Sequence, residues 1–181
     1  MSKVLVPLAS GFEEIEAITI MDLLRRAGVE VVSACLDRRR VIGAHGIKIL
    51  ADKHLNDIDY REFDMIVLPG GMPGALNLKN SSLVQELLGK FDNDNKFIGA
   101  ICAAPIALDS AKILKNAYTC YPSFEKEISN QGYVATENVV SDQNIITSKG
   151  PATALYFALD LVQKLCGEEI ALQVKKGLLL E

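Results

Sequence analysis

Residues 96–105 read K-F-I-G-A-I-C-A-A-P, and this pattern predicts a buried strand followed directly by a helix. The apolar run 97–101 is typical of a buried strand. Residues 103–108 are predicted to form the first turns of a helix, where Pro105 is tolerated because its missing N–H would have no partner there. Cys102 is therefore expected at the corner where the strand ends and the helix begins.

That corner allows two interpretations of Cys102. At the carboxyl edge of a parallel sheet a side chain is presented where ligands bind, and the free N–H groups of a helix start favour the thiolate over the thiol. Cys102 would then be a reactive group. Free cysteine is also among the most buried residue types, so a structural thiol fits this stretch equally well.

Strands and helices alternate along the rest of the chain. Strands are predicted at 4–8, 29–35, 65–68 and 118–120, with hairpins at 41–50 and 139–147. Helices are predicted at 13–27, 82–91, 103–115, 122–130, 151–165 and 168–176. Such alternation predicts an α/β fold with a doubly wound, mostly parallel sheet and helices on both faces. With 181 residues, the chain is expected to form a single domain over 1–181.

Composition excludes several classes of protein. Hydrophobic residues make up 49% of the chain and charged residues 23%, which is typical of a folded globular protein. The net charge of −4 argues against specific nucleic-acid binding, and no apolar run approaches the ~18 residues that span a membrane. Residues 1–3 lead directly into a strand pattern, so we expect no signal peptide and a cytoplasmic location.

The four cysteines, at positions 35, 102, 120 and 166, form no CxxC pair. In a chain without an export signal, this spacing predicts reduced thiols and neither a disulfide framework nor a zinc site. We accordingly expect no metal and no bound cofactor.

Glu16 is the first candidate partner for Cys102. On a 3.6-residue period it shares a stripe with Ile20, Leu23 and Ala27, and a carboxyl on an apolar stripe is uncommon. Burial would raise its pKa, and a protonated carboxyl donates a hydrogen bond to a thiolate or acts as a general acid–base. A helix-dipole acid in the first turn is the alternative, and it already accounts for Glu13 and Glu14.

The run Pro69-Gly70-Gly71 is the second candidate, because glycines after a buried strand let the backbone approach a ligand and offer N–H groups to an oxyanion. An ordinary tight turn is the alternative, and the run lacks the spacing of a dinucleotide-binding fingerprint. The third candidate is histidine, of which the chain holds only His45 and His54. His54 lies in a polar stretch and is expected at the surface.

Five stretches together resemble the ThiJ/PfpI superfamily, in particular its DJ-one branch, which includes bacterial YajL-like proteins. They are G-F-E-E-I-E-A at 11–17, R-R-A-G at 25–28, V-L-P-G-G at 67–71, A-I-C-A-A-P at 100–105 and I-T-S-K-G-P-A-T-A at 146–154. They occur in the family's order from end to end of the chain. The resemblance implies a flavodoxin-like sandwich and a homodimer.

The resemblance also implies roles for individual residues. It assigns the reactive cysteine to Cys102 and its partner glutamate to Glu16, and an oxyanion or substrate-binding pocket to Gly70, Gly71 and Ala103. Many members have a histidine before a proline about twenty residues after the cysteine, and here that residue is Tyr121. Tyrosine titrates near ~10, so it is a poor base at neutral pH but still a hydrogen-bond donor, and we assign Tyr121 to the substrate pocket.

Two further departures narrow the activity that the resemblance implies. Protease-like members have histidine directly after the cysteine, where this chain has Ala103, and no downstream His-x-Glu of an amidotransferase is present. The expected activity is that of a glutathione-independent glyoxalase or protein deglycase, in which Cys102 attacks a 2-oxoaldehyde such as methylglyoxal or glyoxal, or its early adducts on proteins and nucleotides. The alternative is a non-enzymatic oxidative-stress sensor or redox-regulated chaperone that uses oxidation of Cys102.

The composition of the first helix supports the expected homodimer. Apolar residues surround nearly its whole circumference, which is more than one sheet face covers, and no other segment of the chain obviously covers the outer side. A second copy would cover it through a two-fold contact. His45 is then the candidate for a partner residue that lines the pocket.

Overall fold

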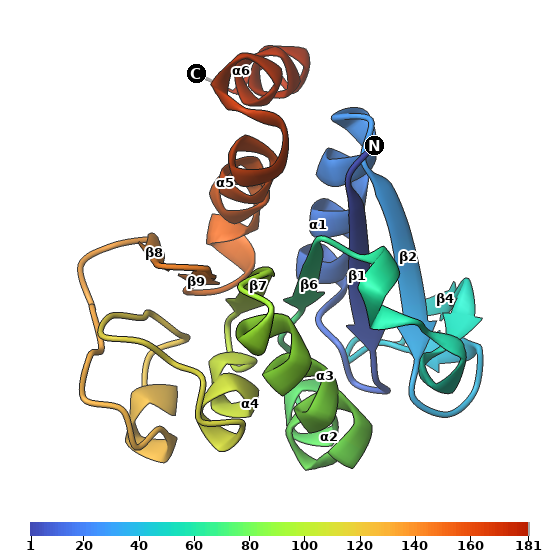
Figure 1. Ribbon diagram of the computed structural model, residues 1–181, viewed down its shortest axis with the longest axis vertical. Helices are drawn as coiled ribbons and strands as arrows, with labels where there is room; N and C mark the ends of the chain where they lie inside the picture. Colours follow the sequence, from blue (N-terminus) through green and yellow to red (C-terminus); the bar gives the residue numbers. More distant parts are fainter. Residues whose placement is uncertain (181) are drawn as a thin grey trace.

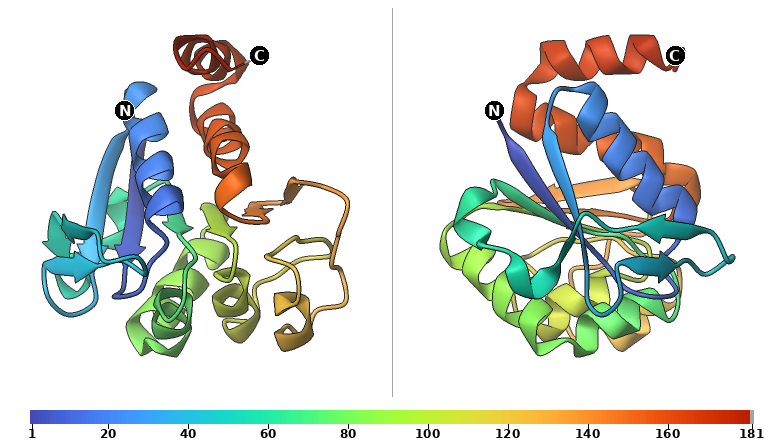
Figure 2. Two further views of the ribbon diagram at one scale, coloured as in Figure 1. Left: turned by 180° about the vertical axis from the view of Figure 1, so that it is seen from behind. Right: turned by 90° about the vertical axis from the view of Figure 1, so that its right-hand side faces the viewer.

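The computed structural model describes residues 1–180, and these form three layers, helix–sheet–helix (Figures 1 and 2). The seven strands of the main sheet follow the order β5-β2-β1-β6-β7-β9-β8. They are β1 (Lys3–Leu8), β2 (Glu30–Cys35), β5 (Lys53–His54), β6 (Met65–Leu68), β7 (Phe97–Ile101), β8 (Val139–Asp142) and β9 (Ile145–Ser148). Every neighbouring pair is parallel except β8 and β9, which confirms the predicted doubly wound α/β fold.

Two groups of helices cover the sheet. One face carries α1 (Glu14–Arg26) and α5 (Ala154–Cys166), with α6 (Glu168–Gly177) packed on α5, and the other carries α2 (Gly74–Asn80), α3 (Ser82–Asn93) and α4 (Pro105–Ser110) (Figure 2). The central strands β6 and β7 are consequently buried on both faces and consist of apolar residues and glycine. Among residues 1–180, no helix combines the length and the apolar composition needed to cross a bilayer.

Three predicted elements differ in the structure. The predicted edge hairpin forms a separate two-stranded sheet from β3 (Arg40–Ile42) and β4 (Lys48–Leu50) instead of extending the main one. The predicted strand at 118–120 is a single bridge between Tyr118 and Tyr133, and the predicted helix at 122–130 is only the 3-10 turn Phe124–Glu127. The Asp109 carboxylate accepts the backbone N–H groups of Ser129 and Asn130, so those donors are not available to a longer helix.

The helix after Cys102 is also shorter than predicted. It begins at Pro105 and ends at Ser110, whereas the pattern predicts a helix from Ala103 to Lys115. Residues 102–104 instead form a tight turn between β7 and α4. The short helix α2 was not predicted, because its start at Gly74 follows the cis peptide bond Met72–Pro73 in a stretch whose glycines and prolines indicate a turn.

Candidate active site

Cys102 occupies the corner between β7 and α4 in a left-handed backbone conformation, with φ of +64°. Few residues other than glycine adopt this conformation, and it persists where the surroundings hold it in place. Here the Cys102 N–H donates to the Ser148 carbonyl at 2.9 Å, and the Cys102 carbonyl accepts the Tyr121 N–H at 2.9 Å. The neighbouring strand and the segment before residue 122 therefore hold the cysteine from both sides.

Glu16 lies in the first turn of α1 and is fully buried, as its place on the apolar stripe predicts. Its Oε2 accepts the backbone N–H of Gly70 at 2.8 Å. Its Oε1 has no hydrogen-bond partner among residues 1–180. A buried carboxyl oxygen without a partner is rare and costly in a folded protein, which makes Glu16 a candidate functional residue.

Gly70 brings Glu16 and Cys102 together. A Cβ atom at this position would lie 2.5 Å from Cys102 Cβ and 2.8 Å from Glu16 Oε2, so only glycine fits between the two side chains. The next residue, Gly71, has a φ of +86°, and a Cβ there would lie 2.3 Å from the Glu13 backbone nitrogen. Gly70 is therefore required by close packing between Cys102 and Glu16, and Gly71 by its left-handed backbone and its close approach to the loop before α1.

The N–H groups at this site do not all have the predicted role. The Gly70 N–H is already bonded to Glu16, so it is not free for an oxyanion as predicted. The N–H groups of Gly71 and Ala103 do face the sulfur of Cys102, and they lower its pKa. The pocket therefore has two backbone donors for a negative charge on the sulfur, one from each of the two neighbouring turns.

Burial and mutual repulsion decide the protonation of the pair. Burial raises the pKa of Glu16 to about 7, although the Gly70 N–H and the Cys102 thiol act against this. Burial and the nearby Glu16 carboxylate raise the pKa of Cys102 to about 12. The backbone N–H groups near the helix start lower the pKa of Cys102, in the predicted direction, but burial and the Glu16 carboxylate outweigh them while Glu16 is ionised.

The two groups consequently share one negative charge over a wide pH range. When the remaining proton lies on Glu16, the carboxyl no longer repels the thiolate and becomes a hydrogen-bond donor to it. The sulfur then also has the N–H groups of Gly71 and Ala103. With a neutral Glu16 and an anionic Cys102, the pair can act as a nucleophile.

Tyr121 lies near Glu16, with Gly150 between the two side chains. Its side chain is half exposed, and its ring packs edge-on against Phe124, with ring centroids 6.3 Å apart. A Cβ at Gly150 would lie 3.2 Å from the Tyr121 ring and 4.0 Å from Glu16 Oε1. Sequence reasoning assigned Gly150 only to a helix start, and the motif S-K-G-P is the signal that could have marked it as part of the site.

Neither histidine reaches Cys102 within this chain. His45 Nδ1 lies 2.8 Å from Glu14 Oε2, and Glu14 Oε1 accepts the backbone N–H groups of His45 and Ile47. These contacts hold the β3–β4 turn against the start of α1. His54 lies on the edge strand β5 and is half-buried, with Nδ1 3.4 Å from Cys35 Sγ, so it is at the surface as expected but only partly exposed.

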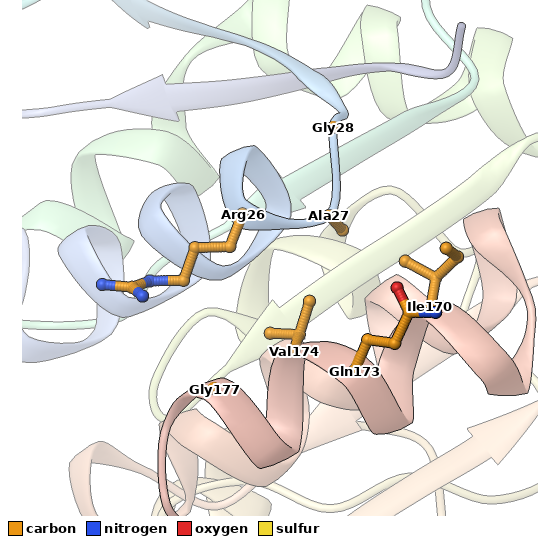
Figure 3. A pocket seen from close by; sticks show the side chains of 7 residues that line it. All are labelled: Arg26, Ala27, Gly28, Ile170, Gln173, Val174 and Gly177. Carbon is orange, nitrogen blue, oxygen red and sulfur yellow. The ribbon is translucent and has the colours of Figure 1, made fainter.

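A cluster of side chains and a surface hollow outside this site could also hold a ligand. Potential metal-ligand atoms of Glu13, Glu14 and His45 lie within 4.8 Å of one another, but Glu14 is already bonded to the β3–β4 turn. A hollow of about 510 Å³ lies between the end of α1 and α6 (Figure 3). Its lining contains no nucleophile or carboxyl group and consists of Arg26, Ala27, Gly28, Ile170, Gln173, Val174 and Gly177. Cys102 remains the candidate nucleophile of the chain.

Comparison with known proteins agrees with this geometry. Protein dj-1beta of Drosophila melanogaster is 42% identical over 183 residues, covering 99% of this chain and 98% of that protein. The glutathione-independent glyoxalase DJR-1.2 of Caenorhabditis elegans is 39% identical over 158 residues, covering 87% of this chain and 84% of that protein. The oxidized structure of Toxoplasma gondii DJ-1 matches with a TM-score of 0.94 at 37% identity, covering 99% of this chain and 98% of that one.

Not every relative has the same length. The chain matches 41% of the length of protein DJ-1 homolog B of Arabidopsis thaliana, to which it is 39% identical over 181 residues. The model of the DJ-1/PfpI family matches residues 2–164. The structural similarity extends over the whole described fold, and the family model includes both Glu16 and Cys102. The chain therefore belongs to the DJ-1/PfpI family, within its DJ-1 branch.

Proposed function

We propose that this protein is a cysteine-dependent, glutathione-independent glyoxalase. It would act on 2-oxoaldehydes such as methylglyoxal and glyoxal, and as a deglycase on their early adducts with proteins and nucleotides. The observation that carries the proposal is the buried Cys102–Glu16 pair, in which Glu16 Oε1 has no partner within the described chain. The glyoxalase name of the Caenorhabditis elegans relative supports the same activity.

The first step forms a covalent adduct. The Cys102 thiolate attacks the aldehyde carbon, the carbonyl π electrons move to oxygen, and this oxygen takes the proton of the neutral Glu16 carboxyl. The product is a hemithioacetal on the sulfur, and Glu16 is left as a carboxylate. A pKa of about 7 suits Glu16 to both giving and taking a proton near neutral pH.

The second step is an internal oxidation and reduction. The Glu16 carboxylate removes the hydrogen of the former aldehyde carbon as a proton and returns it to the neighbouring carbon, while the hydroxyl proton of the hemithioacetal passes to the carbonyl oxygen of that neighbouring carbon. The first carbon becomes a thioester and the second an alcohol, so no external oxidant or reductant is needed. Water then cleaves the thioester to release a 2-hydroxy acid and to restore the thiol of Cys102.

Turnover by the purified protein tests this function. We expect the native chain to convert methylglyoxal to lactate, and we expect Cys102→Ser and Glu16→Gln to lose at least about 100-fold in rate, as removal of a nucleophile or a general acid–base does. Cys166→Ser is the matched control, because this partly buried thiol lies on α5 outside the site. Native rates in both site variants would rule the proposal out.

A second candidate function uses the same sulfur as an oxidation sensor. The N–H groups of Gly71 and Ala103 face the sulfur, and they would also stabilise a sulfinate there. Peroxide would supply the oxygen atoms, with one molecule reduced to water for each oxygen added. Two added oxygens on Cys102 after mild peroxide, in a protein without turnover of methylglyoxal, would favour this function over catalysis.

We also propose that the chain forms a homodimer through α1 and the β3–β4 sheet. The structure corrects the argument from composition, because α5 of the same chain packs against α1 and covers much of its outer side. Apolar side chains nevertheless remain exposed on two adjoining elements, with Ile15 and Ile18 on α1 and Ile47 and Leu50 in the β3–β4 hairpin. The Ala44 N–H donates to Phe12 O, and Glu14 accepts N–H groups of the turn, so the two elements lie side by side.

A further inference from the structure

The hydroxyl groups of Ser148 and Thr153 meet next to the Cys102–Glu16 pair, with their oxygens 2.7 Å apart. Ser148 is the last residue of β9 and is fully buried, and Thr153 ends the 3-10 turn that precedes α5. Ser148 Oγ also donates to the carbonyl of Asn138 at 2.8 Å. The two hydroxyls therefore join the end of β9 to the start of α5.

The hydroxyl of Thr153 also contacts both backbone groups of Gly150. The Gly150 N–H donates to Thr153 Oγ1 at 3.1 Å, and Thr153 Oγ1 lies 2.9 Å from the Gly150 carbonyl oxygen. The Thr153 N–H donates to the same carbonyl at 2.9 Å. Because Ser148 contacts the same hydroxyl, one side chain holds both ends of the turn 148–150.

The turn 148–150 touches both members of the pair. At its first residue, the Ser148 carbonyl accepts the N–H of Cys102 at 2.9 Å, where the cysteine backbone is left-handed. At its last residue, Gly150 packs against the ring of Tyr121, and a Cβ there would lie 4.0 Å from Glu16 Oε1. The position of this turn is therefore felt by the sulfur on one side and by the carboxyl on the other.

The Gly150 N–H does not bond to Glu16, although Gly150 lies near its Oε1. Oε2 of Glu16 accepts the N–H of Gly70, and Oε1 has no partner among residues 1–180. A second N–H, on Oε1, would favour the ionised carboxylate over the neutral carboxyl. Because Thr153 Oγ1 accepts the Gly150 N–H, Oε1 stays free to hold a proton.

We propose that Thr153 is a positioning residue for the Cys102–Glu16 pair. Its hydroxyl holds the turn 148–150 against the cysteine through Ser148, and it keeps the Gly150 N–H from bonding to Glu16 Oε1. The inference rests on the nucleophilic pair of the proposed function and names a residue that supports it. If Thr153 only capped the following helix, its loss would lower stability and leave the chemistry of the thiol unchanged.

Thr153→Val tests the role of the hydroxyl, because valine keeps the shape of the side chain. We expect the freed Gly150 N–H, or water, to reach Oε1 and to favour the carboxylate. The midpoint of the iodoacetamide profile of Cys102 should then fall from about pH 7 to about pH 6, as one hydrogen bond to a charged group implies. The rate above this midpoint should fall about tenfold, because less of the pair then has its proton on Glu16.

The other groups that act on this titration stay in place. Cys102 and Glu13 are the titratable groups that influence the pKa of Glu16, and neither is changed in the variant. The value of kcat/KM for methylglyoxal should fall by a factor similar to that of the alkylation rate. Thr153→Ser, which restores the hydroxyl, should recover the native profile.

Ser148→Ala removes the same contact from the other side and should change the profile in the same direction. It also decides the test if Thr153→Val does not fold. Ser33→Ala is the matched control, because the Ser33 hydroxyl is also buried and donates to Asp52 at 2.7 Å. Ser33 lies on β2, near the opposite edge of the sheet, so its loss should leave the alkylation profile native.

Each outcome decides a different statement. A native profile in the folded Thr153→Val and Ser148→Ala proteins, with lower unfolding midpoints in urea, overturns the positioning role and makes Thr153 a helix cap. A profile altered equally in Thr153→Ser also overturns it, because the hydroxyl is present there. If the profiles change as expected but the native protein does not turn over methylglyoxal, the glyoxalase function fails while the positioning of the pair stands.

Discussion

The backbone N–H of Gly70 donates to Glu16 Oε2 at 2.8 Å, across 54 positions of sequence. This bond joins the turn after β6 to the first turn of α1, and Cys102 lies against the same glycine. The carboxyl and the sulfur are therefore positioned by one residue that has no side chain. The consequences of this arrangement can be measured.

Gly70→Ala should damage both the fold and the site. The new methyl group would lie 2.5 Å from Cys102 Cβ and 2.8 Å from Glu16 Oε2, so the two side chains must move apart. We expect a loss of about 1–3 kcal/mol in the free energy of unfolding, as overpacking costs, together with the loss of methylglyoxal turnover. Gly89→Ala in α3 is the matched control, because a Cβ there meets nothing within 4 Å and alanine should stabilise the helix. Equal stability of the two variants in urea would contradict this account.

Alkylation of Cys102 should follow the protonation of the pair. The doubly protonated pair is unreactive, and the first proton is lost with the pKa of about 7 that burial gives Glu16. The rate with iodoacetamide should therefore rise from pH 5 to about pH 8 and then change little until the second proton leaves near a pKa of about 12.

The other cysteines provide the comparison in the same experiment. Burial raises the pKa values of Cys35, Cys120 and Cys166, and none of these thiols has a carboxyl and two N–H groups arranged as at Cys102. Mass spectrometry of the labelled peptides should show Cys102 reacting first at pH 7.5. Faster labelling of any other thiol would remove the basis for a nucleophilic Cys102.

Glu16→Gln should change how stability depends on pH. Burial raises the pKa of Glu16 in the folded state to about 7 from its ordinary value of 4.5, so the folded state binds the proton more tightly than the unfolded chain does. Its contribution to stability is complete below about pH 4.5 and is lost as the pH rises through 7. Relative to the Glu16→Gln variant, the free energy of unfolding of the native protein should fall by about 3 kcal/mol as the pH rises across this window.

Urea unfolding at pH 4.5 and pH 8 measures that difference directly. Glu86→Gln on α3 is the matched control, because Glu86 is exposed. The free energy of unfolding of this variant should depend on pH as it does in the native chain. Parallel stability profiles of native and Glu16→Gln proteins would mean that Glu16 is not held protonated by burial.

Ile18→Glu should separate the proposed dimer. Ile18 is 46% exposed on α1, so a charged side chain there is tolerated by the monomer but not in an apolar contact between copies. Light scattering should give twice the chain mass of 19.7 kDa for the native protein and the single mass for the variant. Leu172→Glu on α6 is the control, since Leu172 is 55% exposed away from that surface, and it should remain dimeric. A native mass of 19.7 kDa would refute the homodimer.

The sequence predicts the features of the site that depend on local patterns. The corner at Cys102 follows from an apolar run that meets a proline in a first helical turn, and the burial of Glu16 follows from its place on a 3.6-residue stripe. The mostly parallel sheet around them follows from the alternation of strands and helices.

The parts that could not be predicted depend on contacts between distant residues. The N–H of Gly70 is bonded to a carboxyl far away in the sequence, so its loss as a free donor has no local signal. The segment after Tyr118 lacks its predicted regular structure because carboxylates from other parts of the chain accept backbone N–H groups in and next to it. Asp109 accepts the N–H of Ser129, and Asp142 accepts the N–H of Ala117 just before the segment. The left-handed backbone of Cys102 likewise depends on Ser148 and Tyr121.

The partnerless Oε1 of Glu16 has a practical consequence for finding ligands of this protein. A small molecule that donates a hydrogen bond to this oxygen would remove the free-energy cost of a buried oxygen without a partner. Its binding should therefore raise the melting temperature. Hydroxy acids and their amides have such donors and resemble the product of the proposed reaction. Thermal-shift screening of these compounds against the native chain and Glu16→Gln would therefore separate molecules that enter the site from those that bind elsewhere.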